Sequence, residues 1–168
     1  MENITTPEQQ RSKLWGVVLE NTGNPQLVDF TARLIKKNNV PERNDRALAR
    51  AVQVYSQKYI KFFRERPERF AGPLRTILWG LGDCDDKSTL IASILRSFRV
   101  PVRLKFIKFS IKQKDGTIKN VSHVYPQFKY KGAWLALESV HPWALGDDPE
   151  DRARKKGIIP EVNYIGDK

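Results

Sequence analysis

Cysteine and histidine are scarce in this sequence. The 168 residues contain one cysteine, Cys84, and two histidines, His123 and His141. A single cysteine excludes an internal disulfide, and it also excludes the paired-cysteine motifs that hold structural zinc. We therefore expect neither a metal site nor a cofactor.

Long hydrophobic runs are also missing. No stretch approaches the ~18 apolar residues of a membrane span. The first segment, "MENITTPEQQRSKLWGVVLENTG", lacks the apolar core of a signal peptide. We expect no contact with a membrane and a cytoplasmic or virion-associated location, with export by another route left open.

Acidic residues are outnumbered by basic ones. Thirty Lys and Arg stand against 19 Asp and Glu, which gives a net charge of +11. The basic residues are scattered, without an aromatic-interleaved strip or a nucleic-acid motif. One interpretation is a solvated basic surface. The other is salt-sensitive attraction to a polyanion, such as nucleic acid or an acidic cell-wall polymer.

The length and composition fit one globular domain with its own core. Residues 1–24 are polar apart from "LWGVV", and we expect them to form a partly ordered N-terminal arm. Residues 25–141 form the predicted domain. Residues 142–168 are polar and charged, and are predicted to be a C-terminal tail or lid with a candidate short strand at "IIPEVNYI".

Helical periodicity dominates the first half of the chain. Asn24 and Pro25 begin a short amphipathic helix, which "NNVPERN" ends. A longer helix is predicted over about 44–65, ended by Pro67. Its apolar stripe is expected in the core: Leu48, Val52, Tyr55, Tyr59, Phe62 and Phe63. The stretch "ERFAGPLRTILWGLG" reads as irregular, and another helix begins at or beside Cys84.

From Val102 onward the apolar period changes to two. The phase slips at 106–107, which indicates a β-bulge. Asp115-Gly116 is a strong two-residue hairpin signal, and Lys131-Gly132 is a weaker one. Helices followed by a three-stranded antiparallel meander define an α+β fold.

These turns predict which polar side chains share a face of the sheet. The Lys131-Gly132 turn places Tyr125 opposite Glu138. His123, two residues away, then lies on the same face, diagonal to Glu138 at roughly 7–8 Å. The Asp115-Gly116 turn places His123 opposite Lys108, or opposite its neighbour if the bulge is present. The pattern therefore brings a histidine and a carboxylate together.

The stretch "GDCDDKST" places Cys84 at the predicted start of a helix. The helix dipole favours a thiolate there. Asp83, Asp85 and Asp86 oppose a thiolate but favour the helix start, and Asp83 is a candidate cap. A thiolate in this setting needs a cationic neighbour such as protonated His123.

The segments "GDCDDKSTLIASILRSFRVPVRL" and "SHVYPQFKYKGAWLALES" resemble the transglutaminase-like superfamily of papain-type thiol enzymes. They are most similar to its small members from bacteria and phages. The resemblance implies a papain-like fold, with helices packed on an antiparallel sheet. It also implies Cys84 as nucleophile, His123 as base and Glu138 as third member of the triad. Members usually carry Asp at the third position, and often Gly where Arg99 stands.

The implied reaction is acyl transfer on amides through a thioester. The backbone N–H of Cys84 is the natural oxyanion donor. Trp79 would wall the cleft or supply an indole N–H, or else simply pack. His141 is the reserve candidate should Glu138 fail. We favour a peptidase or amidase acting on a protein or a peptidoglycan stem peptide.

Two other classes stay open. A structural or adaptor module, such as a phage virion or assembly component bound to phage structural proteins, would use the surface of the fold. A nucleic-acid binder would use its charge. In both, Cys84 would be a small buried hydrophobe and His123 a core histidine.

Overall fold

The computed structural model describes residues 5–64 and 72–168. In this part of the chain the helices are α1 (Pro7–Asn21), α2 (Pro25–Lys37), α3 (Asp45–Tyr59), α4 (Pro73–Trp79), α5 (Cys84–Ser97) and α6 (Pro149–Lys155). The strands are β1 (Lys61–Phe62), β2 (Leu81–Gly82), β3 (Val102–Lys112), β4 (Ile118–Tyr130), β5 (Ala133–Ala136) and β6 (Glu161–Gly166). No helix among the described residues is both long and apolar enough to cross a bilayer.

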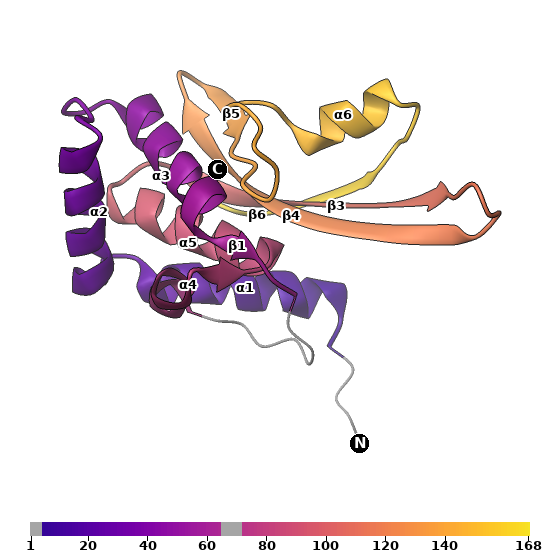
Figure 1. The fold of residues 1–168 in the computed structure, drawn as a ribbon, viewed down its shortest axis with the longest axis horizontal. Helices are drawn as coiled ribbons and strands as arrows, with labels where there is room; N and C mark the ends of the chain where they lie inside the picture. The colour runs from indigo at the N-terminus through magenta and orange to yellow at the C-terminus, as the bar shows by residue number, and fades with distance from the viewer. Residues whose placement is uncertain (1–4, 65–71) are drawn as a thin grey trace.

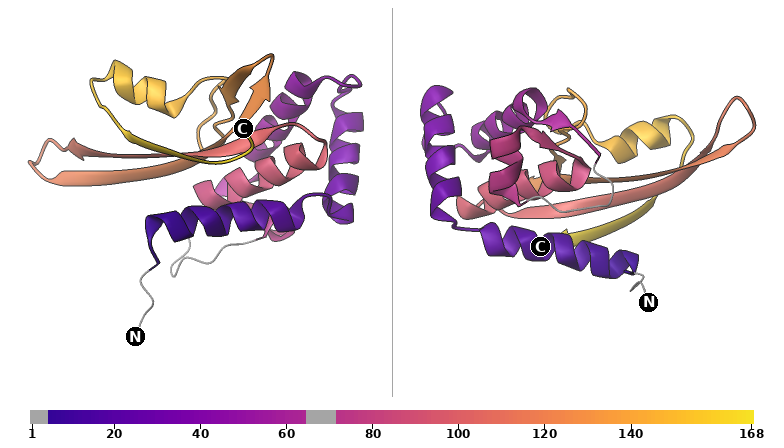
Figure 2. Two further views of the ribbon diagram at one scale, coloured as in Figure 1. Left: turned by 180° about the vertical axis from the view of Figure 1, so that it is seen from behind. Right: turned by 60° about the horizontal axis from the view of Figure 1, so that its bottom comes forward.

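The larger sheet is antiparallel, with strand order β5-β4-β3-β6. Helices α1 and α5 lie on one side of it and α6 lies on the other, and the β3–β4 hairpin extends well beyond both layers (Figures 1 and 2). The predicted α+β class, with helices packed on an antiparallel sheet, is confirmed. The sheet has a fourth strand, β6, which the predicted three-stranded meander did not include. It begins within "IIPEVNYI", where a short strand was a candidate, and ends one residue beyond that stretch.

The first hairpin differs from the prediction by one residue. The Gln113 N–H bonds to the Thr117 carbonyl at 2.8 Å, so the loop holds three residues rather than two, and Gly116 has a φ of 86°. A type I turn followed by a left-handed glycine is typical of such loops. The extra residue shifts the register, and His123 pairs with Ile107 rather than with Lys108.

The predicted β-bulge at 106–107 is wrong. The β3–β4 register runs without interruption from Val102 to Lys112. Leu104 and Lys105 are both buried, because helices cover one face of this stretch and α6 covers the other. The alternation of apolar residues therefore changes where a different element covers the strand, whereas the backbone of the strand stays regular. The second turn is confirmed, with Tyr130 opposite Ala133.

Residues 7–21, within the segment expected to be a partly ordered arm, form helix α1. Helix α1 opens with a capping box in which Thr6 and Gln9 exchange hydrogen bonds, and it buries Leu14 and Val18 in the core. The signal was present in "TPEQ": a capping threonine, a proline at the first turn and a glutamine three residues later.

The middle of the chain also differs from the expectation. Helix α3 ends at Tyr59, which is 57% exposed, and Phe62 and Phe63 are each 50% exposed, so only the first part of the predicted stripe is core. The stretch expected to be irregular contains α4, which begins at Pro73 and is capped by a left-handed Gly80. Both residues act as helix boundaries. Pro67 lies outside the described residues.

Residues 142–168 belong to the sheet and its cover. Lys105 is 4% exposed, and its ammonium lies 3.0 Å from Asp148 and 2.6 Å from Glu150, at the start of α6. The Tyr125 hydroxyl donates to Asp148 at 2.5 Å. Buried ion pairs of this kind hold the two elements in place, because removing one partner leaves the other charge buried and unpaired. The segment therefore packs on the sheet through α6 and pairs with β3 through β6.

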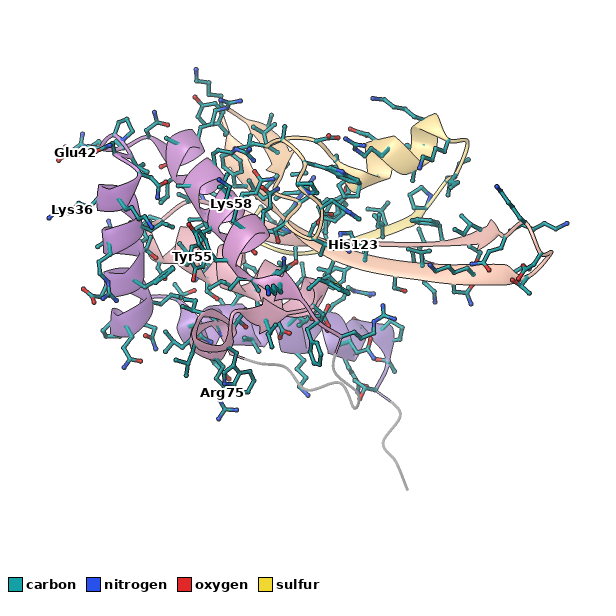
Figure 3. The ribbon with its side chains drawn as sticks, viewed as in Figure 1. Lys36, Glu42, Tyr55, Lys58, Arg75 and His123 are labelled. Atoms are coloured by element: carbon teal, nitrogen blue, oxygen red, sulfur yellow. The ribbon has the colours of Figure 1, made fainter. Side chains whose placement is uncertain are left out.

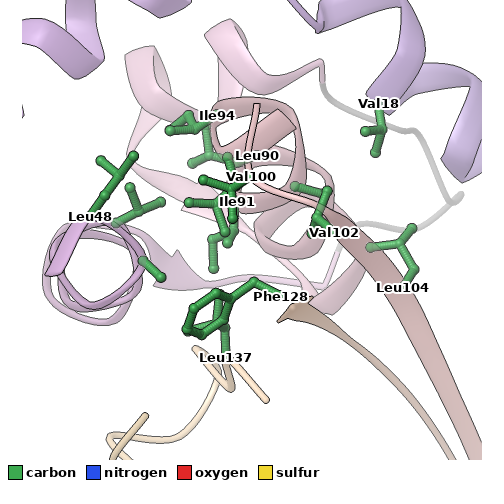
Figure 4. Packing of buried hydrophobic residues seen from close by; sticks show 14 of the residues in the cluster. Val18, Leu48, Leu90, Ile91, Ile94, Val100, Val102, Leu104, Phe128 and Leu137 are labelled. Carbon is green, nitrogen blue, oxygen red and sulfur yellow. The ribbon is translucent and has the colours of Figure 1, made fainter. Parts of the chain in front are cut away.

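Helix α5 is the centre of the fold. Its apolar face, Leu90, Ile91, Ile94 and Leu95, is fully buried against strands and helices (Figure 4). After α5 the chain turns through Arg99, which has a φ of 61°. This left-handed conformation favours glycine, which accounts for the glycine that family members often carry at this position. The burial of α5 fixes where its first residue, Cys84, stands.

Candidate active site

Cys84 is the first residue of α5, as predicted. The Asp83 carboxylate accepts hydrogen bonds from the N–H groups of Asp85 and Asp86 at 3.0 and 3.1 Å. The Asp86 carboxylate accepts one in return from the Asp83 N–H at 3.1 Å. This reciprocal box confirms Asp83 as the cap and Asp86 as a helix-start residue. Gly82 is required here, because an added Cβ would lie 2.8 Å from the Cβ of Asp86.

The start of α5 lies beside the outer edge of β4. One turn after Cys84, the buried Ser88 hydroxyl donates to the Val124 carbonyl at 3.1 Å. The backbone N–H of Val124 also faces the Cys84 sulfur, where it favours the thiolate. Backbone groups of a strand point along the plane of its sheet. The thiol therefore lies at the edge of the strand, one residue from His123.

His123 and Glu138 are in contact, as the strand registers predicted. The His123 Nε2 lies 2.5 Å from a Glu138 carboxylate oxygen. Glu138 is 1% exposed, whereas the His123 side chain is 15% exposed. Because Glu138 occupies Nε2, Nδ1 is the ring nitrogen left for the thiol. His123 lies at the base of the β3–β4 hairpin (Figure 3).

Helix α3 holds the backbone around Glu138. The Gln53 and Gln57 side-chain amides donate to the Glu138 carbonyl at 2.8 and 3.0 Å. The second carboxylate oxygen of Glu138 accepts the Val140 N–H at 2.7 Å. The buried Lys87 ammonium donates to the Ser139 carbonyl at 3.1 Å. Sequence reasoning missed Gln53, Gln57 and Lys87, since these contacts join residues far apart in the chain.

The charges around the site favour a neutral thiol beside an ionised carboxylate. Burial raises the pKa of Cys84 well above its ordinary value, the Asp85 and Asp83 carboxylates raise it further, and the Val124 N–H opposes them. Burial alone would raise the pKa of Glu138, but the hydrogen bond and charge of His123 bring that pKa below its usual value. A reactive thiolate therefore requires a base that removes the thiol proton.

Replacing Asp85 by Asn is expected to speed alkylation of Cys84 by iodoacetamide at pH 7. The Asp85 carboxylate lies 3.8 Å from the sulfur. Removing its charge lowers the thiol pKa, and we expect a rate about threefold to tenfold higher. Asp29→Asn, on the exposed surface of α2, is the matched control. A rate that stays level or drops in Asp85→Asn would contradict this electrostatic account.

Cys84 and His123 line one cavity of about 510 Å³. The first half of α1 borders it with Gln10 and Arg11, and β6 borders it with Glu161 and Asn163. These wall residues were missed because both chain ends were expected to lie outside the domain. Further lining residues are Asp83, Asp85, Phe62, Arg64, Phe106, Lys108 and Ser122.

Two other candidates lie outside this cavity. Within the described part of the chain, neither Trp79 nor His141 is among its lining residues. Trp79 is 52% exposed, beside Arg75. The exposed His141 ring stacks on Trp143 at 4.6 Å. The structure thus gathers Cys84, His123, Glu138 and the three aspartates, leaves Trp79 apart, and places His141 near Glu138 but outside the cavity lining.

Comparison with known proteins identifies the family of this chain. The model of the transglutaminase-like superfamily matches residues 29–139, so the chain belongs to that superfamily. No curated protein matches the chain.

Among solved structures, a proposed cysteine protease from Cytophaga hutchinsonii is similar at a TM-score of 0.53 and 15% identity, over 98% of this chain and 56% of that one. The chain thus spans little more than half of that protein's length. Legionella pneumophila LapG is similar at a TM-score of 0.51 and 14% identity, over 88% of this chain and 81% of that one. At these identities the likeness shows the fold, which is the predicted transglutaminase-like, papain-like one.

Proposed function

We propose that this protein is a cysteine peptidase or amidase that cleaves amide bonds through a thioester on Cys84. The observation that carries the proposal is the grouping of three side chains. Cys84 and His123 line one cavity, and a buried Glu138 holds the far nitrogen of the His123 ring. A thiol, an imidazole and a carboxylate in this order are the parts of a nucleophilic triad.

In the proposed reaction the His123 Nδ1 accepts the thiol proton as the Cys84 sulfur attacks the amide carbonyl carbon. Glu138 stabilises the imidazolium that forms. The helix-start N–H of Cys84 stabilises the oxyanion, since first-turn N–H groups have no partner within their own helix. The C–N bond then breaks, and His123 returns the proton to the leaving amine.

Water completes the cycle. His123 removes a proton from water as the water oxygen attacks the thioester carbonyl, and the C–S bond breaks to release the acid and restore the thiol. We favour hydrolysis over transfer to a second amine because a proposed cysteine protease is among the similar solved structures. The proposed substrate is a protein or a peptidoglycan stem peptide.

A structural or adaptor module, such as a phage virion component, is the second candidate. The observation that favours it is the raised pKa of Cys84, because a neutral, largely buried thiol is unreactive by itself. In that case the sulfur would react with electrophiles no faster than a free model thiol, and replacing His123 would change nothing.

Digestion of a mixed peptide library, followed by mass spectrometry, tests the proposed function. We expect wild-type protein to release new termini, and Cys84→Ala to release none above background. Lys36→Ala, on the exposed surface of α2, should match wild type. Equal cleavage by wild type and Cys84→Ala would assign the activity to a contaminant, and no cleavage by wild type would favour the adaptor.

A further inference from the structure

The outer edge of β4, which faces away from β3, has different hydrogen-bond partners along its length. Strand β5 pairs with residues 127–130, and the Pro126 carbonyl accepts the Leu137 N–H at 2.9 Å. The Val124 carbonyl accepts the Ser88 hydroxyl. Even-numbered residues therefore direct their backbone groups outward. By the period of two, Ser122, Asn120 and Ile118 do the same, and no described strand pairs with β4 there.

This unpaired edge leads directly to the candidate nucleophile. Ser122 lines the same cavity as Cys84 and His123. From there the edge continues along the projecting β3–β4 hairpin (Figure 1). A polypeptide added as a strand along this edge would bring its next residues to the sulfur. Strand addition of this kind uses main-chain hydrogen bonds for affinity.

The charge of the hairpin selects which polypeptide fits. Residues 108–122 carry four lysines and one aspartate. The lysines, Lys108, Lys112, Lys114 and Lys119, are all exposed. The Asp115 carboxylate is engaged by the Thr117 N–H and hydroxyl. Lys119 lies on β4 itself, Lys108 and Lys112 lie on the neighbouring β3, and Lys114 lies in the loop between the two strands. Lysines on and beside a free edge repel an identical edge of a second copy, yet attract an acidic strand.

Charge at the other end of the path is mixed, because Arg11, Arg64 and Lys108 line the cavity together with Asp83, Asp85 and Glu161. Asp83 and Asp85 flank Cys84 and disfavour an acidic residue beside the bond to be cleaved. The rise of about 3.3 Å per strand residue separates Val124 from Asn120 by roughly 13 Å. Three of the four lysines, Lys112, Lys114 and Lys119, lie beyond that distance, so most of the attraction for carboxylates begins about four residues from the nucleophile.

We propose that the free edge of β4 at residues 118–122 binds an extended, acidic polypeptide segment by strand addition. The acidic residues of that segment lie about four to six residues from the bond that is cleaved. This names a substrate class for the same site, and in that respect rests on the proposed function. The binding step itself needs no chemistry at Cys84.

Fluorescence anisotropy with full-length Cys84→Ala tests the binding step alone. The probes are two fluorescein-labelled dodecapeptides of Thr, Ser and Val, one with three Glu and one with three Lys at matched alternate positions. We expect the acidic probe to bind at least about tenfold more tightly at low salt, with the difference shrinking as salt rises. Equal binding of the two probes would overturn the proposal.

Two further arms separate this edge from general attraction to a basic protein. Lys112→Glu with Lys119→Glu should weaken acidic-probe binding about tenfold, whereas Lys36→Glu with Lys37→Glu, at the opposite end of the molecule, should change it less than about twofold. N-methylation of the central six amides of the acidic probe should also cost about tenfold or more. Equal loss in both charge reversals, or no loss on methylation, would refute strand addition.

The two proposals can fail separately. Peptide hydrolysis by wild-type protein reports on Cys84 chemistry, whereas probe binding to Cys84→Ala reports on the edge. If the acidic probe binds at the edge and no peptide is hydrolysed, the substrate-binding inference stands and the proposed enzymatic function fails. Hydrolysis without any preference for acidic probes would do the reverse.

Discussion

His123→Ala lowers the rate of peptide hydrolysis by about a thousandfold or more in this account. General acid–base catalysis supplies about 10²–10⁴-fold in rate, and the raised thiol pKa puts this site at the upper end. Without the imidazole, burial and two carboxylates keep the sulfur protonated at neutral pH. The leaving amine also loses its proton donor. The readout is kcat/KM for the peptide that wild-type protein cleaves fastest.

His141→Ala is the matched control for this prediction. It removes the second histidine of the chain, whose ring is exposed and stacked on Trp143. We expect activity within about twofold of wild type. If His141→Ala were inactive and His123→Ala active, the base would be misassigned, and the site would have to be rebuilt around the segment that follows Glu138.

Glu138→Gln is expected to reduce kcat by about 10²–10⁴-fold. The amide is nearly isosteric, but it is neutral, and it allows the wrong ring tautomer of His123 to be held. The Glu138 carboxylate is almost fully buried and lies 2.5 Å from the ring nitrogen. Burial raises the pKa of Glu138, but the hydrogen bond and charge of His123 bring that pKa below its usual value, so the carboxylate is charged across the neutral range.

Glu138→Asp tests the charge of the carboxylate separately from its distance to the His123 ring. The family usually carries aspartate here, so the charge is kept while the carboxylate recedes by one methylene. We expect activity between those of wild type and Glu138→Gln, with thermal unfolding followed in parallel to exclude loss of the fold. Wild-type activity in Glu138→Gln would remove Glu138 from the triad.

Much of the site was predictable because its determinants are local. The cap of α5 is formed by consecutive residues around Cys84. Aspartate side chains there accept hydrogen bonds from N–H groups that have no partner within the helix. The Lys131-Gly132 turn fixed the β4–β5 register, and that register alone brought His123 to Glu138. Neither step needs knowledge of distant contacts.

The remaining features depend on contacts that no local pattern encodes. Asp115-Gly116 signals a turn but does not fix its length, and the one-residue difference moved His123 from Lys108 to Ile107. Helix α1 was not predicted, because only a short apolar stretch of it is buried against α5. The Gln53 and Gln57 amides look like ordinary helix residues until the fold brings the Glu138 carbonyl to them.

The most direct test of the account measures the rate at which iodoacetamide alkylates Cys84 between pH 5 and 10, in wild type and in His123→Ala. If His123 accepts the thiol proton, wild type reacts near neutral pH faster than a free model thiol. In His123→Ala that neutral reactivity disappears, and the rate rises only at high pH, because burial and the flanking carboxylates raise the thiol pKa. Identical profiles for the two proteins, or a wild-type sulfur that reacts only after unfolding, would contradict the claim that Cys84 and His123 work as a pair.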